Sequence, residues 1–201
     1  ETLYVTLGER HTHPTHKVAA QLVTELLREY ERSPLTVGLE LEHNMQRSGI
    51  RSALSRTFRD VGLSSEGYEQ MAAYTSEMMV SHSPKGTRLI FDYLHDQRHN
   101  IASIFTDCAR NITNGKSTID FTDPSTAKTA AELGYEEDEI STTDAAGMHI
   151  RNAHMIKRLT HTAEQHGSRI AIQSCGSAHV NGYKAPDKSQ ATESLMQGFK
   201  D

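Results

Sequence analysis

The sequence predicts a single α/β domain over residues 1–201, built on a mostly parallel sheet flanked by helices. Alternating apolar residues from Leu3 to Leu7 are typical of a strand, a helical pattern follows, and the apolar run Leu35–Leu41 is typical of a second strand. This order is a βαβ unit, whose connection is right-handed. A third observation supports the same class: Ile170–Ser174, near the other end of the chain, repeats the opening pattern of a strand followed by a glycine turn.

The other elements follow from apolar spacing and from helix end signals. Apolar residues from Val18 to Tyr30 recur at helical spacing, and Ser33-Pro34 ends that helix. Asp144 is a suitable N-cap for a long helix that runs to about His166, with Gly167 as its stop. The weaker expectations are a polar helix or loop at 44–57, helices from Ser64 and over Leu89–Leu94, a strand over Ile101–Phe105, and a terminal helix near Thr192–Phe199.

The segment at about 111–143 is the least regular part of the sequence. It combines turn residues, an acidic run and few apolar positions. We therefore expect an irregular and mobile excursion from the domain.

Composition excludes several classes of protein. The net charge is −5 and no basic stripe stands out, which argues against a nucleic-acid partner, and no apolar run is long enough to span a bilayer. Two cysteines, Cys108 and Cys175, do not make a disulfide framework, so a reducing compartment is expected. Cys175 invites interpretation as a nucleophile paired with His179, but a strand-end cysteine is more typically buried and inert.

Two Gly-x-x-His turns carry the first candidate site residues. The first strand is followed by GERH at 8–11, and the last strand by GSAH at 176–179. The turns place Glu9, His11 and His179 at the C-terminal ends of strands, where ligands bind in open α/β sheets. The alternative for each histidine is an ordinary turn residue, and His13 and His16 fit an exposed position at least as well.

Two charged residues lie in apolar surroundings. Glu40 belongs to the second strand, where a carboxylate is desolvated unless a cation, a metal or hydrogen-bond donors compensate it. The alternatives are an edge position that faces water, or Glu42 as the buried carboxylate. Arg151 lies on the apolar stripe of the long helix, near its start. It either extends to solvent or points along the sheet toward an anionic group.

These motifs, in this order, resemble the superfamily of erythromycin esterase, the haem-binding lipoprotein ChaN and the TraB/Tiki proteases. The GExH opening with Pro14 and His16 is most similar to ChaN, whereas Arg151-Asn152-x-x-Met155 and the second Gly-x-x-His are similar to TraB/Tiki. The first turn is one residue shorter than in erythromycin esterases, and the motifs do not assign an equivalent of the tyrosine that also ligates haem in ChaN. The sequence also resembles the HopBA type III effectors of plant-pathogenic Pseudomonas, which share this fold.

The resemblance implies an EreA/ChaN-like fold and a hydrolase-like site, esterase- or protease-like. His11 would take a proton from water, Arg151 and His179 would stabilise the oxyanion, and Glu40 would orient His11 or the water. A divalent metal held by His11, Glu40 and His179 is a variant of this layout.

The alternative class is a haem or ligand carrier without catalysis. An effector would be secreted into the host cell cytoplasm and act on a small molecule or a host protein. If the protein is not an effector, the bacterial cytoplasm or periplasm is expected. The sequence is compatible with either a monomer or an oligomer.

Overall fold

The computed structural model describes residues 2–10, 13–31, 34–43, 93–94, 96–97, 99–113, 116–136, 139–181 and 198–199. The segment predicted at 44–57 and the helix predicted from Ser64 lie outside these residues, and so does most of the expected terminal helix. Tyr93 and Leu94 are helical, as the pattern over Leu89–Leu94 predicts. No helix in the described part of the chain is both long and apolar enough to cross a membrane.

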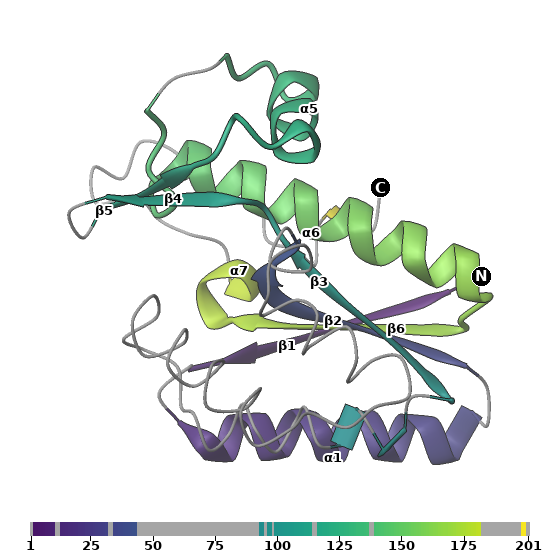
Figure 1. Cartoon of the computed structure of the whole chain (residues 1–201). Helices are drawn as coiled ribbons and strands as arrows, with labels where there is room; N and C mark the ends of the chain where they lie inside the picture. Colours follow the sequence, from purple (N-terminus) through teal and green to yellow (C-terminus); the bar gives the residue numbers. More distant parts are fainter. Residues whose placement is uncertain are drawn as a thin grey trace.

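Four parallel strands form the main sheet in the order β1-β6-β2-β3 (Figure 1). All four were predicted, and they are Leu3–Glu9 (β1), Leu35–Glu42 (β2), Ile101–Asp107 (β3) and Ile170–Gly176 (β6). Glu9 pairs in register with Gly176, and Glu42 pairs with Asp107 after a register shift that follows Leu39. The C-terminal ends of the four strands therefore share one edge of the sheet.

Helices cover both faces of this sheet, as Figure 1 shows. Helix α1 (Pro14–Glu31) lies on one face, where its Leu27 packs against the core cluster that includes the alternate apolar residues of β2, from Leu35 to Leu41. Helix α6 (Ala145–His166) lies on the other face, where its Leu159 packs with Ala171 of β6. Because successive strand residues point to opposite faces, Glu40 faces α6 while its neighbours Leu39 and Leu41 face α1.

The ends of α6 follow the predicted signals. The side chain of Asp144 accepts a hydrogen bond from the N–H of Gly147 at 2.7 Å, which satisfies one of the unpaired donors of the first turn. Gly167 ends the helix with φ of 60°, in the left-handed region that glycine adopts without strain. Because α6 precedes the parallel strand β6, its first turns lie at the C-terminal edge of the sheet.

The expectation of an irregular excursion at 111–143 is wrong. This stretch contains an antiparallel hairpin, β4 (Arg110–Thr113) with β5 (Lys116–Ile119), and a helix, α5 (Pro124–Glu132), capped by Asp123. Their few apolar residues form a small core with the start of α6, made of Cys108, Ile119, Ala130 and Ile150. These elements are short and rich in Ser, Thr and Lys, so the sequence shows no clear apolar periodicity there.

Candidate functional site

Glu40 is the centre of a hydrogen-bonded group at the C-terminal edge of the sheet. Its side chain is buried, and among the described residues three donors reach its two oxygens. Oε1 accepts from Nη2 of Arg151 at 2.5 Å and from Nε2 of His179 at 3.1 Å, and Oε2 accepts from the N–H of Gly176 at 2.5 Å. Donors of this kind favour the ionised carboxylate, so the buried negative charge of Glu40 is compensated.

His179 connects β6 with α6. It lies in the short helix α7 (Ser177–Asn181), which directly follows β6, and only 2% of its surface is exposed. Its Nε2 faces Glu40, and its Nδ1 lies 2.5 Å from Oδ1 of Asn152 in α6. Both ring nitrogens thus face a side-chain oxygen that can accept a hydrogen bond. The sequence did not single out Asn152 as a site residue, although the Arg-Asn-x-x-Met motif contains it.

Arg151 donates its hydrogen bonds to two carboxylates and does not direct them toward a position where a substrate oxyanion could form. Its Nε and Nη2 donate to Asp107 at 3.1 and 2.8 Å, and Nη2 also donates to Glu40. Its Nη1 donates to the carbonyl of Thr142 at 3.4 Å and to Sδ of Met148 at 3.6 Å. Since a guanidinium has five N–H groups, these contacts occupy all of them. The predicted role of Arg151 as oxyanion stabiliser is therefore corrected to a positioning role.

The charge of Arg151 is stable in this position. Burial lowers the pKa of an arginine, but the carboxylates of Asp107 and Glu40 outweigh burial and raise it above its ordinary value. Arg151 therefore remains a cation between the two carboxylates, and it lowers the pKa of Asp107.

Asp107 is a site residue that the sequence interpretation missed. It ends β3, is fully buried, and also accepts from Arg110 at 2.7 Å and from the N–H of Cys108 at 2.9 Å. Burial raises the pKa of a carboxyl group, but Arg151 and Arg110 reverse this effect and hold the pKa of Asp107 at about 2. The available signal was its place at the end of an apolar strand, where Glu9 was singled out after the first strand.

Glu42, the alternative to Glu40, lies in a different ion pair. Its Oε2 accepts from the backbone N–H of Arg110 at 3.3 Å, and its Oε1 lies 3.6 Å from Nε of the same arginine. Glu40, not Glu42, is the β2 carboxylate that contacts Arg151. Both carboxylates are buried, and they differ in the arginine that they contact.

Glu9 lies at the same sheet edge as Glu40, but its side chain is on the face of the sheet that α1 covers. It is buried at the end of β1 and lines a cavity of about 230 Å³ together with Ala19 and Ala20 of α1 and Ser174 of β6. Cys175 lies near both carboxylates: burial raises the pKa of its thiol, and the charges of Glu40 and Glu9 raise it further. Cys175 is therefore buried and protonated, as expected for an inert strand-end cysteine.

His11 lies outside the described residues, so its relation to Glu40 stays a prediction. His13 is exposed, and its N–H donates to the carbonyl of Arg10 at 2.9 Å. Among the described residues no group of three His, Cys, Asp or Glu side chains is suited to a metal ion. The metal set proposed from the sequence includes His11 and thus extends beyond that part of the chain.

Comparisons with known proteins identify the fold. No family model matches the sequence, and no curated protein matches it either. Among solved structures, a mutant of the erythromycin esterase EreC in its open conformation superposes with a TM-score of 0.56 at 12% identity, covering 100% of this chain and 67% of that chain. ChaN of Campylobacter jejuni, a structure with cofacially bound haem, has a TM-score of 0.44 at 11% identity, covering 98% and 77%.

The class defined by fold is therefore a single α/β domain with a mostly parallel sheet. More particularly, it is the EreA/ChaN-like fold, the architecture that the sequence motifs predicted.

Proposed function

We propose that this protein is a hydrolase that cleaves an ester at the Glu40 edge of the sheet. The observation that carries the proposal is the chain of contacts from Asn152 through His179 to Glu40, fixed by Arg151 in a buried and charged setting. Fold similarity to a protein described as an erythromycin esterase favours an ester over an amide. The same contacts suit a preorganised electrostatic site, which catalyses by stabilising the charge of the transition state.

In the proposed mechanism, water attacks the ester carbonyl and His11 takes the proton that the water loses. A tetrahedral oxyanion forms, and the carbon–oxygen bond to the alcohol breaks as the oxyanion collapses. His179, held by Glu40, supplies the positive charge that stabilises the oxyanion. Exchange of Asn152 for the substrate oxygen at Nδ1 lets His179 protonate the departing alkoxide. Arg151 orients Glu40 and does not touch the substrate.

The haem carrier is the alternative function. Iron would reach His179 only by displacing Asn152 or Glu40, the same kind of exchange that the hydrolase mechanism needs at Nδ1, so the experiments below separate the two functions. The expectation of an effector acting in a host cell rests on the resemblance of the sequence motifs, and we retain it as a proposal for the setting of the reaction.

The test is hydrolysis of chromogenic p-nitrophenyl esters of increasing acyl length by the full chain. Glu40→Gln keeps the shape of the side chain but removes its charge, and His179→Asn removes the imidazole. Each should lower kcat/KM by at least about 100-fold, the lower end of what general acid–base residues contribute. His11→Ala should lower kcat/KM to the same extent.

Glu132→Gln is the matched control, because Glu132 is a half-exposed carboxylate of α5 whose partner is Lys157. It should leave kcat/KM unchanged, and circular dichroism should show that all variants are folded. If wild-type and Glu40→Gln proteins hydrolyse every ester equally slowly, the hydrolase proposal is wrong. Titration with haem then tests the haem-carrier alternative, because bound haem would give a Soret band.

A further inference from the structure

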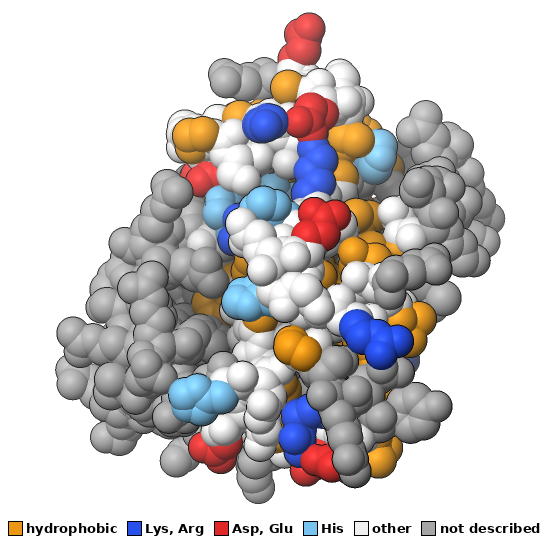
Figure 2. Space-filling model, turned by 90° about the vertical axis from the view of Figure 1, so that its right-hand side faces the viewer, with side chains coloured by type: hydrophobic (Ala, Val, Ile, Leu, Met, Phe, Trp, Pro, Cys, Tyr) orange, Lys and Arg blue, Asp and Glu red, His pale blue; other side chains and the backbone are white. Residues whose placement is uncertain are grey.

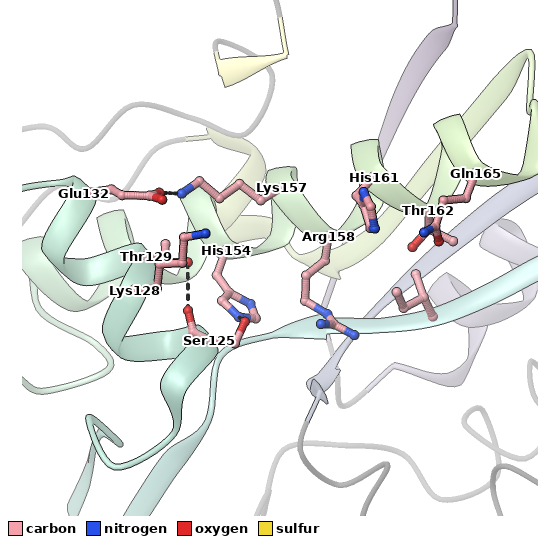
Figure 3. Close-up of a pocket in the computed structure, with 11 residues that line it drawn as sticks. Ser125, Lys128, Thr129, Glu132, His154, Lys157, Arg158, His161, Thr162 and Gln165 are labelled. Atoms are coloured by element: carbon pink, nitrogen blue, oxygen red, sulfur yellow. Dashed lines mark hydrogen bonds and ion pairs between the residues drawn. The ribbon is translucent and has the colours of Figure 1, made fainter.

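A polar groove, separate from the Glu40 site, lies between α5 and α6 and next to β3 (Figure 3). Its volume is about 520 Å³, within the range of small-molecule sites. On α6 its wall consists of residues spaced four, three and four apart, so they share one face of the helix. These residues are His154, Arg158, His161 and Gln165. Glu40 and Arg151 do not line this groove, which is separate from the site proposed above.

Positive charge dominates the lining of the groove. Lys128 comes from α5, and Lys157 and Arg158 come from α6. Glu132 is the single carboxylate among the described residues that line it, and it pairs with Lys157. Within the described part of the chain, Lys128 makes no ion pair. Charged side chains of both signs and histidines are spread over the face drawn in Figure 2, and the chain as a whole is acidic, with net charge −5.

The two lysines repel one another. Burial lowers the pKa of Lys157, and the nearby charge of Lys128 lowers it further. An anion placed between them would remove this repulsion, because it would favour the charged form of both side chains.

The floor of the groove is fixed by hydrogen bonds to β3. Nε of Arg158 donates to the carbonyl of Phe105 at 3.0 Å, which fixes the plane of the guanidinium. Nδ1 of His154 donates to the carbonyl of Thr106 at 2.9 Å, so Nε2 accepts from the hydroxyl of Ser125 at 3.2 Å. Burial lowers the pKa of His154 to about 4, and the ring is therefore neutral at neutral pH. The floor is preorganised, and its charge comes from the Lys and Arg side chains.

We infer that this groove binds a small ligand that carries a phosphate or sulfate group. The guanidinium of Arg158 and the two lysines come from facing helices, and a dianion would compensate their charge, with Lys157 shared between the anion and Glu132. The groove, at about 520 Å³, is larger than one phosphate or sulfate group requires. For comparison, a single water molecule takes about 30 Å³ in the liquid. The remaining space, beside Thr162 and Gln165, suits a hydroxyl-rich body of sugar size.

The test is isothermal titration calorimetry of the full chain at constant low ionic strength. Four probes are compared: glucose 6-phosphate, glucose, inorganic phosphate and inorganic sulfate. Glucose 6-phosphate should bind and glucose should not, and inorganic phosphate should compete with the sugar phosphate. Lys128→Gln and Arg158→Gln should each raise Kd about tenfold, as expected for the loss of one charged hydrogen bond. Binding of sulfate as tight as that of phosphate supports a general dianion site, and weaker binding of sulfate narrows the class to phosphorylated ligands.

Lys116→Gln is the matched control, because Lys116 is an exposed residue of β5 that does not line the groove. It makes the same change in net charge and should leave Kd unaltered. The inference is overturned if neither phosphate probe binds, or if Lys116→Gln weakens binding as much as Lys128→Gln does. Melting temperatures check the fold of each variant. Lys128 is exposed, so its replacement keeps the test valid even if Arg158→Gln unfolds the protein.

Discussion

Replacing Arg151 by methionine removes the cation that lies between Asp107 and Glu40 but keeps a long side chain in its place. Both carboxylates are buried, and each receives a direct hydrogen bond from this arginine. Breaking a buried ion pair by removing one partner costs about 3–5 kcal/mol, because a buried charge is left uncompensated. A domain has only about 5–15 kcal/mol of stability, so Arg151→Met should remove a large fraction of it.

The assay is urea denaturation followed by circular dichroism, at neutral pH and in acid. The pKa of Asp107 in the folded protein, about 2, lies below its ordinary value of 3.8. Its contribution, on the order of 2 kcal/mol, is therefore present above about pH 4 and is lost as the pH falls through about 2. In Arg151→Met the uncompensated carboxylates take up protons in acid. The difference in stability between wild type and variant should therefore shrink as the pH falls.

The control is Lys157→Met on the same helix, where the ion pair with Glu132 is about half exposed. It should change stability by less than about 1 kcal/mol. The reasoning about Arg151 is refuted if Arg151→Met also costs less than about 1 kcal/mol, or if its effect does not depend on pH. The double variant Asp107→Asn/Arg151→Met should lose less than the sum of the single variants, because the two residues are in contact.

Three further predictions concern residues outside the Glu40 group. Because burial holds the pKa of His154 at about 4, unfolding takes up a proton there, and stability should fall between about pH 6.5 and 4 by on the order of 3 kcal/mol. Urea denaturation in that pH range should show a flatter profile for His154→Gln than for wild type. Gly38→Ala places a Cβ 2.5 Å from Oε1 of Gln173 and 2.8 Å from Cγ2 of Thr106, so thermal unfolding should reveal a loss of about 1–3 kcal/mol. The thiols of Cys108 and Cys175 are buried with raised pKa values, so both should resist Ellman's reagent until denaturant is added, and rapid labelling of the native protein would contradict their burial.

The sequence identified those features that depend on local pattern. The four strands of the main sheet were found because each is a short apolar run that ends at polar residues. The boundaries of α6 were found because Asp144 and Gly167 satisfy its end groups by local hydrogen bonding and backbone geometry. Glu40, Arg151 and His179 meet because parallel strands end at one edge of the sheet and a helix that precedes a strand begins there.

Features that depend on tertiary context were not identified. Whether Arg151 is open to a substrate is decided by the carbonyl of Thr142 and by Met148 and Asp107, and no sequence spacing shows those contacts. Asp107 is one of 26 acidic residues, and it becomes distinct only when β3 pairs with β2. The elements at 111–143 are short and polar, so they are stable only because their few apolar side chains pack beneath α6. One of these is Ile119.

The position of β6 has a consequence for how the chain folds. β6 separates β1 from β2, and Leu3 pairs with Ile170, whereas β1 pairs with no other described strand. During synthesis β1 and the β6-facing edge of β2 therefore stay without these partners until β6 has been made. Such distant pairings slow folding, and open edges favour incorrect association. Gly176 and His179 arrive with β6, so Glu40 acquires its donors in the same late event that closes the sheet.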